Sequence, residues 1–288
     1  MHLGSLVAAL GSFLEARSRG GRWLLRMEDL DTPRVVPGAA AEILRTLERL
    51  QLLWDGEVLY QSSRGPHYVA ALEALARRGV TFQCSCSRRD LGDPGELAER
   101  PYPGTCRSGA RRPGPTATRL RIEDGRRVRF EDRFQGGCEF DLDRLGDVVL
   151  RRRDAQIAYQ LAVVVDDAAQ GVSDVVRGAD LLPSTAWQIE LYRYMGLPEP
   201  THAHLPLLVE PDGSKLAKSR RSVPIDLQDA GNWLLLALGA LRQHPPADLG
   251  RARPETVLSW ALSHWQPERI RGVKNTPAPE IASKTGFY

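Results

Sequence analysis

The sequence predicts an α/β fold built on a parallel sheet, with a small subdomain inserted into it and a short helical part at the C-terminus. Strand-like apolar segments alternate with helical periodicities over residues 1–83 and again over residues 147–210, as is typical of parallel sheets. Residues 84–146 contain all four cysteines and many prolines and glycines, which indicates an insertion. Residues 211–288 return to a helical pattern, so we expect four successive parts.

The first part contains three predicted helices and two predicted strands. Over residues 4–19 the leucines recur at helical spacing, and Gly20 favours an end to that helix. The same criteria predict a strand at 22–27, helices at 38–52 and 65–78, and a strand at 80–82.

The remaining elements follow from the same patterns. Two segments of the insertion, 118–122 and 128–134, have the character of a hairpin. The Asp-Gly pair at 212–213 predicts a hairpin turn that presents residues 214–219 as a loop, and the tail after Pro267 is weakly patterned. After the insertion we expect strands at 148–150, 172–176 and 205–209, and helices at 157–167, 183–195, 226–243 and 254–264.

The composition excludes several classes of protein. The chain has 288 residues, of which 42% are hydrophobic and 26% charged, as in ordinary globular proteins. No apolar run approaches the roughly 18 residues of a membrane span, and the N-terminus lacks the pattern of a secretory signal. Four cysteines are too few for a disulfide scaffold, so we expect a cytoplasmic protein without membrane contact. The formal net charge of +3 permits a nucleic-acid partner without requiring one.

The first candidate site is the tetrapeptide His2-Leu3-Gly4-Ser5 at the start of the N-terminal helix. A nucleotide phosphate binds where backbone N–H groups at a helix start are accessible, and a glycine such as Gly4 permits its close approach. An imidazole such as that of His2 can engage the extra negative charge of a pentacoordinate α-phosphate. The alternative interpretation is an ordinary histidine near a chain end.

The second candidate site is the loop that carries Lys215, Lys218 and Ser219. Only four of the 39 basic residues are lysines, and two of them lie three residues apart here. In a chain that otherwise uses arginine, this spacing indicates a need for compact, mobile ammonium groups, which stabilise charge on a reacting phosphate. The alternative interpretation is a solvated basic turn.

These two motifs resemble the HIGH and KMSKS signatures of class I aminoacyl-tRNA synthetases, whose fold contains a Rossmann-type parallel sheet. Within the glutamyl branch of that class, the chain most resembles the glutamyl-queuosine tRNA(Asp) synthetases, which lack the anticodon-binding domain. The part of the chain after Ser219 leaves little room for such a domain. The resemblance extends to about residue 220 and includes the longer segments Arg26–Asp31, Trp54–Gly56, Ala158–Asp167 and Val176–Leu182.

The resemblance implies roles for residues of both motifs. The implied catalytic residues are His2, Lys215 and Lys218. The residues implied to bind ATP are His2, Gly4, Ser5, Lys215, Lys218 and Ser219.

Three further residues are implied to bind glutamate. Glu28 is the implied partner of the ammonium group, and Tyr159 and Arg177 are implied as further contacts, of which Arg177 suits a carboxylate. From the residues alone, the alternatives are a solvated acidic turn for Glu28, core packing for Tyr159 and a surface charge for Arg177.

The cysteines of the insertion form a third candidate site. Cys84, Cys86 and Cys106 lie in a turn-rich segment where no large core can form, so a metal ion would supply folding free energy. Chemistry alone favours Cys138 as a fourth ligand, whereas the family pattern, with a tyrosine four residues before the last cysteine, implies Tyr102. We follow the family pattern, which implies a structural Zn²⁺ ion and leaves Cys138 as a buried apolar thiol.

The resemblance also implies the reaction. Glutamate and ATP, accompanied by Mg²⁺, would give glutamyl-adenylate without tRNA, and the glutamyl group would pass to the queuosine base in the anticodon of tRNA(Asp). We expect a monomer. Two alternatives stay open: a truncated glutamyl-tRNA synthetase catalytic domain that charges tRNA(Glu), and a non-catalytic protein that binds glutamate or a nucleotide.

The chain departs from the family pattern at its beginning. Family members start with a strand and an Arg-Phe-Ala-Pro-Ser-Pro-type turn that contributes to the glutamate site, and Met1 stands where that segment ends. We expect that the first strand is missing and that the natural start lies upstream of Met1. A chain that begins at Met1 is expected to activate glutamate weakly or not at all.

Overall fold

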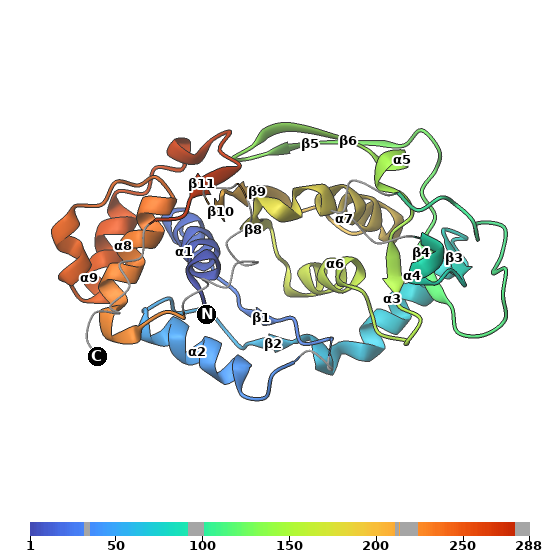
Figure 1. Ribbon diagram of the computed structural model, residues 1–288, viewed down its shortest axis with the longest axis horizontal. Helices are drawn as coiled ribbons and strands as arrows, with labels where there is room; N and C mark the ends of the chain where they lie inside the picture. The colour runs from blue at the N-terminus through green and yellow to red at the C-terminus, as the bar shows by residue number, and fades with distance from the viewer. Residues whose placement is uncertain (32–34, 92–100, 211–212, 214–223, 280–288) are drawn as a thin grey trace.

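A computed structural model describes residues 1–31, 35–91, 101–210, 213 and 224–279 (Figure 1). The four-stranded sheet of these residues has the order β6-β5-β9-β8. Strand β9 is parallel to β8 and β5, whereas β5 and β6 are antiparallel. Only three residues join β5 to β6, and so short a connection permits only antiparallel pairing. The sheet is therefore mixed: the predicted parallel pairing holds for β8, β9 and β5, and the antiparallel β5–β6 pair departs from it. The strands are β5 (Arg127–Asp132), β6 (Gly136–Asp141), β8 (Asp174–Gly178) and β9 (Thr201–Leu205).

Two smaller sheets come from the first half of the chain and its insertion. Strands β1 (Arg26–Met27) and β2 (Leu59–Tyr60) pair in parallel, as a sheet separate from the four-stranded one. Strands β3 (Thr81–Cys84), β4 (Ala117–Leu120) and β7 (Val149–Arg151) form an antiparallel sheet in the order β3-β4-β7. The predicted hairpin within the insertion is wrong in its pairing, because β4 pairs with β3 and β7 while β5 pairs with β6 and β9.

The C-terminal part contributes the last sheet. Strand β10 (Leu207–Val209) pairs in parallel with β11 (Asn275–Pro277), so its described partner is the tail of the chain and not a strand that follows the Asp-Gly turn. The tail that looked weakly patterned therefore forms η7 (Pro267–Ile270) and β11. The predicted loop 214–219 lies outside the described residues.

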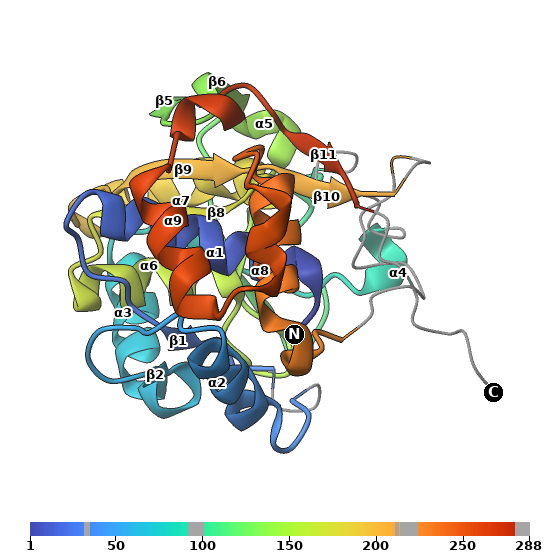
Figure 2. The ribbon, with the colours of Figure 1, turned by 90° about the vertical axis from the view of Figure 1, so that its left-hand side faces the viewer.

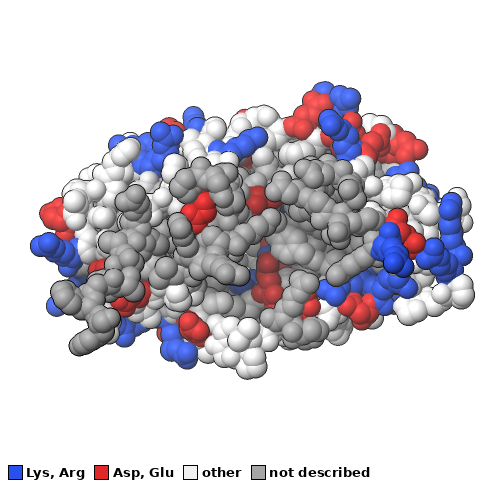
Figure 3. Space-filling view, viewed as in Figure 1, with Lys and Arg blue, Asp and Glu red and all other residues white. Residues whose placement is uncertain are grey.

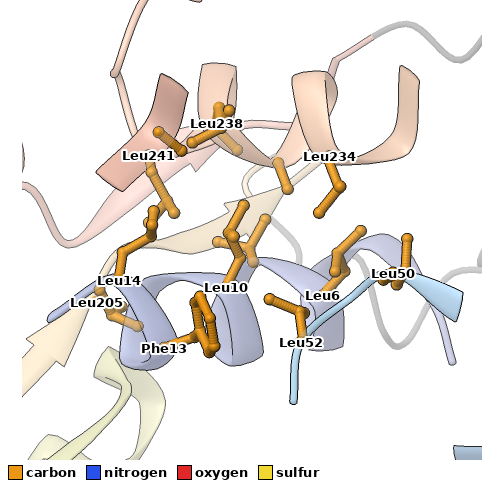
Figure 4. Close-up of a cluster of buried hydrophobic side chains, with 14 of the residues drawn as sticks. Leu6, Leu10, Phe13, Leu14, Leu50, Leu52, Leu205, Leu234, Leu238 and Leu241 are labelled. Atoms are coloured by element: carbon orange, nitrogen blue, oxygen red, sulfur yellow. The ribbon is translucent and has the colours of Figure 1, made fainter. Parts of the chain in front are cut away.

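Helix α1 (Leu3–Ser18) lies at the centre of one hydrophobic core. Leu6, Leu10 and Leu14 are fully buried and lie four residues apart, so they share one face of the helix. In Figure 4 this part of α1 lies against α8 (Ala230–Ala240), which contributes Leu234 and Leu238 to the same cluster. Figure 2 shows α8 and α9 (Pro254–Ser263) side by side over α1.

A glycine permits α1 to approach the four-stranded sheet closely. A Cβ atom at Gly11 would lie only 2.7 Å from Cδ1 of Leu205 on β9. A larger residue at this position would force the Leu205 side chain, or the helix itself, to move.

The other long helices are confirmed, with small differences at their ends. Helices α3, α6 and α7 share a second core in which Leu75, Leu161 and Leu191 are fully buried.

Within the part of the chain that the structure describes, no helix is long and apolar enough to cross a membrane. The four-part division of the chain stays a prediction. The helices are α2 (Ala39–Arg49), α3 (Gly65–Arg77), α6 (Tyr159–Gln170), α7 (Leu182–Met195) and α9 (Pro254–Ser263), with short helices α4 (Arg88–Leu91) and α5 (Leu142–Leu145).

Candidate active site

Helix α1 begins with the imidazole of His2 at its N-cap. Nδ1 of His2 accepts a hydrogen bond from the backbone N–H of Ser5 at 3.3 Å, and Nε2 lies 3.0 Å from Oγ of Ser5. A Cβ atom at Gly4 would lie 3.2 Å from Cε1 of His2, so glycine leaves room for the imidazole over the first turn. No acidic residue lies in this first turn, and the positive end of the helix dipole therefore favours an anion.

A pocket of about 220 Å³ lies beside this helix start. The pocket brings together His2, Gly4 and Ser5, three of the residues predicted to bind ATP, at the carboxyl ends of two parallel strands. Ligands of open α/β sheets usually bind at this edge. Sequence analysis missed the rest of the lining. Apart from Ala8 on α1, these residues lie at or just after the ends of β8 and β9, and that position was their signal: Gly178, Asp180, Leu205, Pro206, Leu207 and Leu208.

Lys215, Lys218 and Ser219, predicted for ATP binding, lie outside the described residues. Residues on the far side of that gap do reach the start of α1. The backbone N–H of Ile225 donates to the carbonyl of Met1 at 3.2 Å, and Pro224 forms an isolated β-bridge with His2.

The three residues predicted to bind glutamate form one cluster. Nη1 of Arg177, on β8, lies 3.5 Å from the hydroxyl oxygen of Tyr159, the first residue of α6. Glu28 directly follows β1 and interacts electrostatically with both side chains. Tyr159 and Arg177 are each half-buried, so neither is a fully enclosed core residue or a free surface charge.

The surroundings of Glu28 raise its pKa. Desolvation by the protein is the main cause, and Asp167 and Asp166 add repulsion, whereas Arg26 and Arg177 oppose the shift. A side chain that is 43% exposed is nevertheless accessible to a ligand. A bound ammonium group would favour the ionised carboxylate, which is the chemistry expected of an amino-group partner.

Two consecutive aspartates of α6 support this cluster. Asp166 is fully buried and accepts a hydrogen bond from Nε of Arg64 at 2.6 Å, and Asp167 pairs with Arg26 at 2.8 Å, two residues before Glu28. Paired and hydrogen-bonded buried charges hold the elements that they join in one geometry. Sequence analysis did not single them out, although an acidic pair inside an apolar helix was a visible signal.

The cysteines of the insertion come together as well. The Sγ atoms of Cys84, Cys86 and Cys106 lie within 4.8 Å of one another. The hydroxyl oxygen of Tyr102 lies 3.3 Å from Sγ of Cys84 and accepts a hydrogen bond from the backbone N–H of Cys106 at 2.8 Å. Three sulfur atoms and one phenolic oxygen thus form a compact group, and this donor set fits a tetrahedral zinc ion.

Hydrogen bonds change the acidity of these thiols in opposite directions. Burial opposes ionisation of Cys106, but backbone N–H groups of Ser85 and Arg111 and the hydroxyl of Tyr102 outweigh it and lower its pKa to about 6. Burial and the neighbouring Cys106 thiol raise the pKa of Cys86 to about 11. Several thiolates this close repel one another, so a bound cation would favour their joint ionisation.

Cys138 lies apart from this group. It is on β6, directly across from Phe130 on β5, and its thiol donates to the carbonyl of Gly136 at 3.5 Å. The side chain is half-buried, not buried as expected. Of the two residues considered as a fourth ligand, the structure places Tyr102, and not Cys138, beside the three thiols.

Comparison with known proteins identifies the family. Residues 1–238 match the family described as tRNA synthetases class I (E and Q), catalytic domain. The chain belongs to this family. A protein of Ectopseudomonas mendocina named Glutamyl-Q tRNA(Asp) synthetase is 51% identical over 271 residues, which cover 94% of this chain and 90% of the relative. A protein of Pseudomonas aeruginosa PAO1 with the same name is 50% identical over 282 residues, which cover 98% and 94%. Among the class I synthetases, the chain therefore falls with the glutamyl-Q tRNA(Asp) synthetases.

Solved structures confirm the class I synthetase fold. A glutamate tRNA ligase from Elizabethkingia meningosepticum, in complex with its amino acid, superposes with a TM-score of 0.78 at 22% sequence identity. The match covers 97% of this chain but only 64% of that ligase. A glutamate-tRNA synthetase from Elizabethkingia anophelis gives a TM-score of 0.77 at 22% identity over 96% of this chain and 65% of its own length.

Proposed function

We propose that the protein activates glutamate with ATP and transfers the glutamyl group to the queuosine base in the anticodon of tRNA(Asp). In the first step a glutamate carboxylate oxygen bonds to the α-phosphorus, and the bond to pyrophosphate breaks. In the second step a queuosine hydroxyl oxygen bonds to the glutamyl carbonyl carbon, AMP leaves with the electron pair, and the hydroxyl proton is released. The names of relatives about half identical over nearly the whole chain support this proposal.

The observation that carries the proposal is the adjacency of two sites on β8. Arg177 belongs to the cluster with Glu28 and Tyr159, and the next residue, Gly178, lines the pocket at the start of α1. Consecutive Cα atoms lie about 3.8 Å apart, so the two proposed sites adjoin on this strand. Adenylate formation requires that the amino acid and the nucleotide be bound next to each other.

Charge complementarity assigns partners to several charged groups of the substrates. Arg177 would bind a carboxylate of glutamate, and Glu28 would bind the ammonium group. His2 and the start of α1 would face the phosphates of ATP. Lys215 and Lys218 would stabilise the charge that develops on the α-phosphate and pyrophosphate.

Two metal ions are part of the proposal. Mg²⁺ would accompany ATP and neutralise its phosphates. A zinc ion would be held by Cys84, Cys86, Tyr102 and Cys106, and four protein ligands leave no open position for a substrate, so its contribution would be to folding.

Transfer to tRNA requires a surface that accepts a polyanion. Figure 3 shows Lys and Arg side chains gathered at the end of the molecule that carries β3 and α4, and Arg111 and Arg112, near β3, are exposed. Such a surface suits the phosphates of an RNA stem. Because ATP and tRNA meet in the cytoplasm, we assign the reaction to that compartment, with the protein acting as a monomer.

Two measurements on the protein expressed from its own gene test the proposal. Glutamate-dependent exchange of labelled pyrophosphate into ATP, without tRNA, tests the first step. Transfer of labelled glutamate to tRNA(Asp) with queuosine, tRNA(Asp) without it, and tRNA(Glu) tests the second. We expect glutamate-dependent pyrophosphate exchange, and transfer of glutamate only to the tRNA(Asp) that carries queuosine. Charging of tRNA(Glu) would instead identify a glutamyl-tRNA synthetase catalytic domain, and glutamate binding without exchange would identify a binding protein.

A further inference from the structure

The guanidinium of Arg177 is fixed by hydrogen bonds to buried side chains. Arg177 and His204 lie directly opposite each other in the register of β8 and β9, and Nε of Arg177 donates to Nε2 of His204 at 3.1 Å. Nη2 donates to Oε1 of Gln188 at 2.7 Å and to Oγ1 of Thr185 at 2.9 Å. These contacts occupy two of the three nitrogens, and Nη1 is the one beside Tyr159.

The other nitrogen of this histidine meets a buried carboxylate. Nδ1 of His204 lies 2.5 Å from Oδ2 of Asp132, and both side chains are fully buried. Oδ1 of Asp132 accepts the backbone N–H groups of Phe134, Gln135 and His204, at 3.1, 2.9 and 3.1 Å. Asp132 is therefore fixed by the turn that follows β5 and by β9 itself.

The protonation state of His204 follows from the groups that face its two ring nitrogens: Asp132 at Nδ1 and Arg177 at Nε2, which also lies 3.3 Å from Oγ1 of Thr185. Nε of Arg177 always carries a hydrogen, so Nε2 of His204 must accept, and the single ring proton must lie on Nδ1, facing Asp132. Burial lowers the pKa of His204 and the charge of Arg177 adds to this effect, although the hydrogen bond to Asp132 opposes it. The imidazole is thus neutral and in one tautomer.

We propose that Asp132 and His204 are a positioning pair for Arg177: Asp132 fixes the tautomer of His204, and His204 holds the guanidinium so that Nη1 is presented to a substrate carboxylate beside Tyr159. Neither member of the pair touches the substrate in this arrangement. The inference rests on the proposed glutamate site and adds two residues to it that no sequence motif indicated.

The substitution Asp132→Asn tests the pair with a minimal change of shape. The asparagine oxygen must remain at Oδ1, because three backbone N–H groups donate there. The amide NH₂ then faces Nδ1 of His204, so Nδ1 has to become an acceptor and the ring proton moves to Nε2. The N–H at Nε2 then faces the N–H of Arg177, and the hydrogen bond between the two side chains is lost. We expect the glutamate KM in pyrophosphate exchange to rise about 10- to 100-fold, with the ATP KM within about twofold of the unmodified protein.

Two further substitutions separate positioning from general destabilisation. Asp147→Asn neutralises another buried carboxylate, one that accepts hydrogen bonds from Arg107 and from the backbone of Ile122, and it should leave the glutamate KM unchanged. In a background carrying His204→Leu, Asp132→Asn should add no further loss, because Asp132 acts through His204. His204→Gln, whose amide oxygen can replace Nε2 as acceptor, should restore part of the affinity lost in His204→Leu.

The imidazole tautomer provides a readout that does not depend on activity. In ¹⁵N-histidine spectra, the signal of His204 is identified as the one that is missing in His204→Gln. This signal should show the ring proton on Nδ1 in the unmodified protein, and on Nε2 in the Asp132→Asn variant. A proton on Nε2 in the unmodified protein would overturn the proposal, as would a changed tautomer with an unchanged glutamate KM. If the unmodified protein shows no pyrophosphate exchange, the proposed glutamate activation is wrong. The spectra would still show whether Asp132 fixes the tautomer of His204.

Discussion

The hydroxyl oxygen of Tyr102 lies 3.3 Å from Sγ of Cys84, in a segment where three thiols gather around it. The backbone N–H of Cys106 donates to the same oxygen, so Tyr102 is held in place by the residue four positions later. Its ring lies beneath the guanidinium of Arg119, whose Cζ is 4.0 Å from the ring centroid. Tyr102 is therefore oriented from both ends, as a metal ligand needs to be.

We expect Tyr102→Phe to weaken zinc binding about 10- to 100-fold, because the phenylalanine ring keeps the packing and removes only the oxygen. Competition with a chromophoric chelator measures this change. Cys138→Ser is the matched control, since Cys138 lies on β6 away from the cluster, and it should leave the zinc affinity unchanged. Loss of zinc in Cys138→Ser but not in Tyr102→Phe would show that the assignment of the fourth ligand is wrong.

Removal of zinc should destabilise the region around the thiols more than the rest of the protein. Cys84, Cys106 and Phe82 form a separate small core with few other buried apolar residues, so the proposed zinc ion would supply much of its folding free energy. We expect amide hydrogens of β3 and β4 to exchange faster after chelation, while those of α1 and α8 keep their protection. Equal loss of protection in all four elements would contradict a local structural role.

Substitution of Glu28 should affect glutamate binding selectively. Glu28→Gln keeps the size of the side chain but removes the charge that the substrate ammonium group would meet, so we expect a glutamate KM at least about 10-fold higher and an unchanged ATP KM. Glu57→Gln, at an exposed position, is the control for loss of one negative charge. Equal effects of the two substitutions would argue against Glu28 as a substrate contact. The measurement is pyrophosphate exchange at varied glutamate and ATP concentrations.

The two lysines of the 214–219 segment should affect the chemical step. We expect Lys215→Ala and Lys218→Ala each to lower kcat of pyrophosphate exchange about 100- to 1000-fold, because in the proposed mechanism each removes a cation that would stabilise charge formed only in the transition state. The glutamate KM should change little. Lys274→Ala, at an exposed position whose backbone carbonyl bonds to Leu207, is the control and should retain full kcat. A fall in kcat that is no larger than that of the control would remove the lysines from the mechanism.

His202 should make the protein sensitive to acid. It is buried, both ring nitrogens lack a hydrogen-bond partner among the described residues, and burial lowers its pKa to about 3. In the unfolded chain the pKa of this histidine is about 6.5. Its contribution to the free energy of unfolding should therefore be constant above about pH 6.5. Below about pH 6.5 the free energy of unfolding should fall by about 1.4 kcal/mol per pH unit, down to about pH 3. His202→Phe should flatten this dependence in denaturant titrations at pH 8 and pH 5. His67→Gln, at an exposed position, should not change it.

Much of the candidate site could be predicted because its residues sit in local patterns. His2, Gly4 and Ser5 were indicated by their position at a helix start, and Glu28, Tyr159 and Arg177 by longer segments typical of one enzyme family. The structure brings the members of each group close to one another. Asp132 and His204 were missed, because nothing in their own neighbourhoods marks them: each gains its role only from a partner in a distant segment.

The sequence by itself determined where helices such as α1, α6 and α7 form, because helical periodicity is a local property that shows which face of a segment is buried. Only the tertiary structure decided which strands are neighbours: β5 beside β9, β4 beside β3 and β7, and β10 beside β11. Alternation along a strand shows which side chains are buried but carries no information on the partner strand, which depends on hydrogen bonds between segments far apart in the chain. The register of β8 and β9 sets Arg177 opposite His204, so the buried support of the proposed glutamate site exists only in the folded protein.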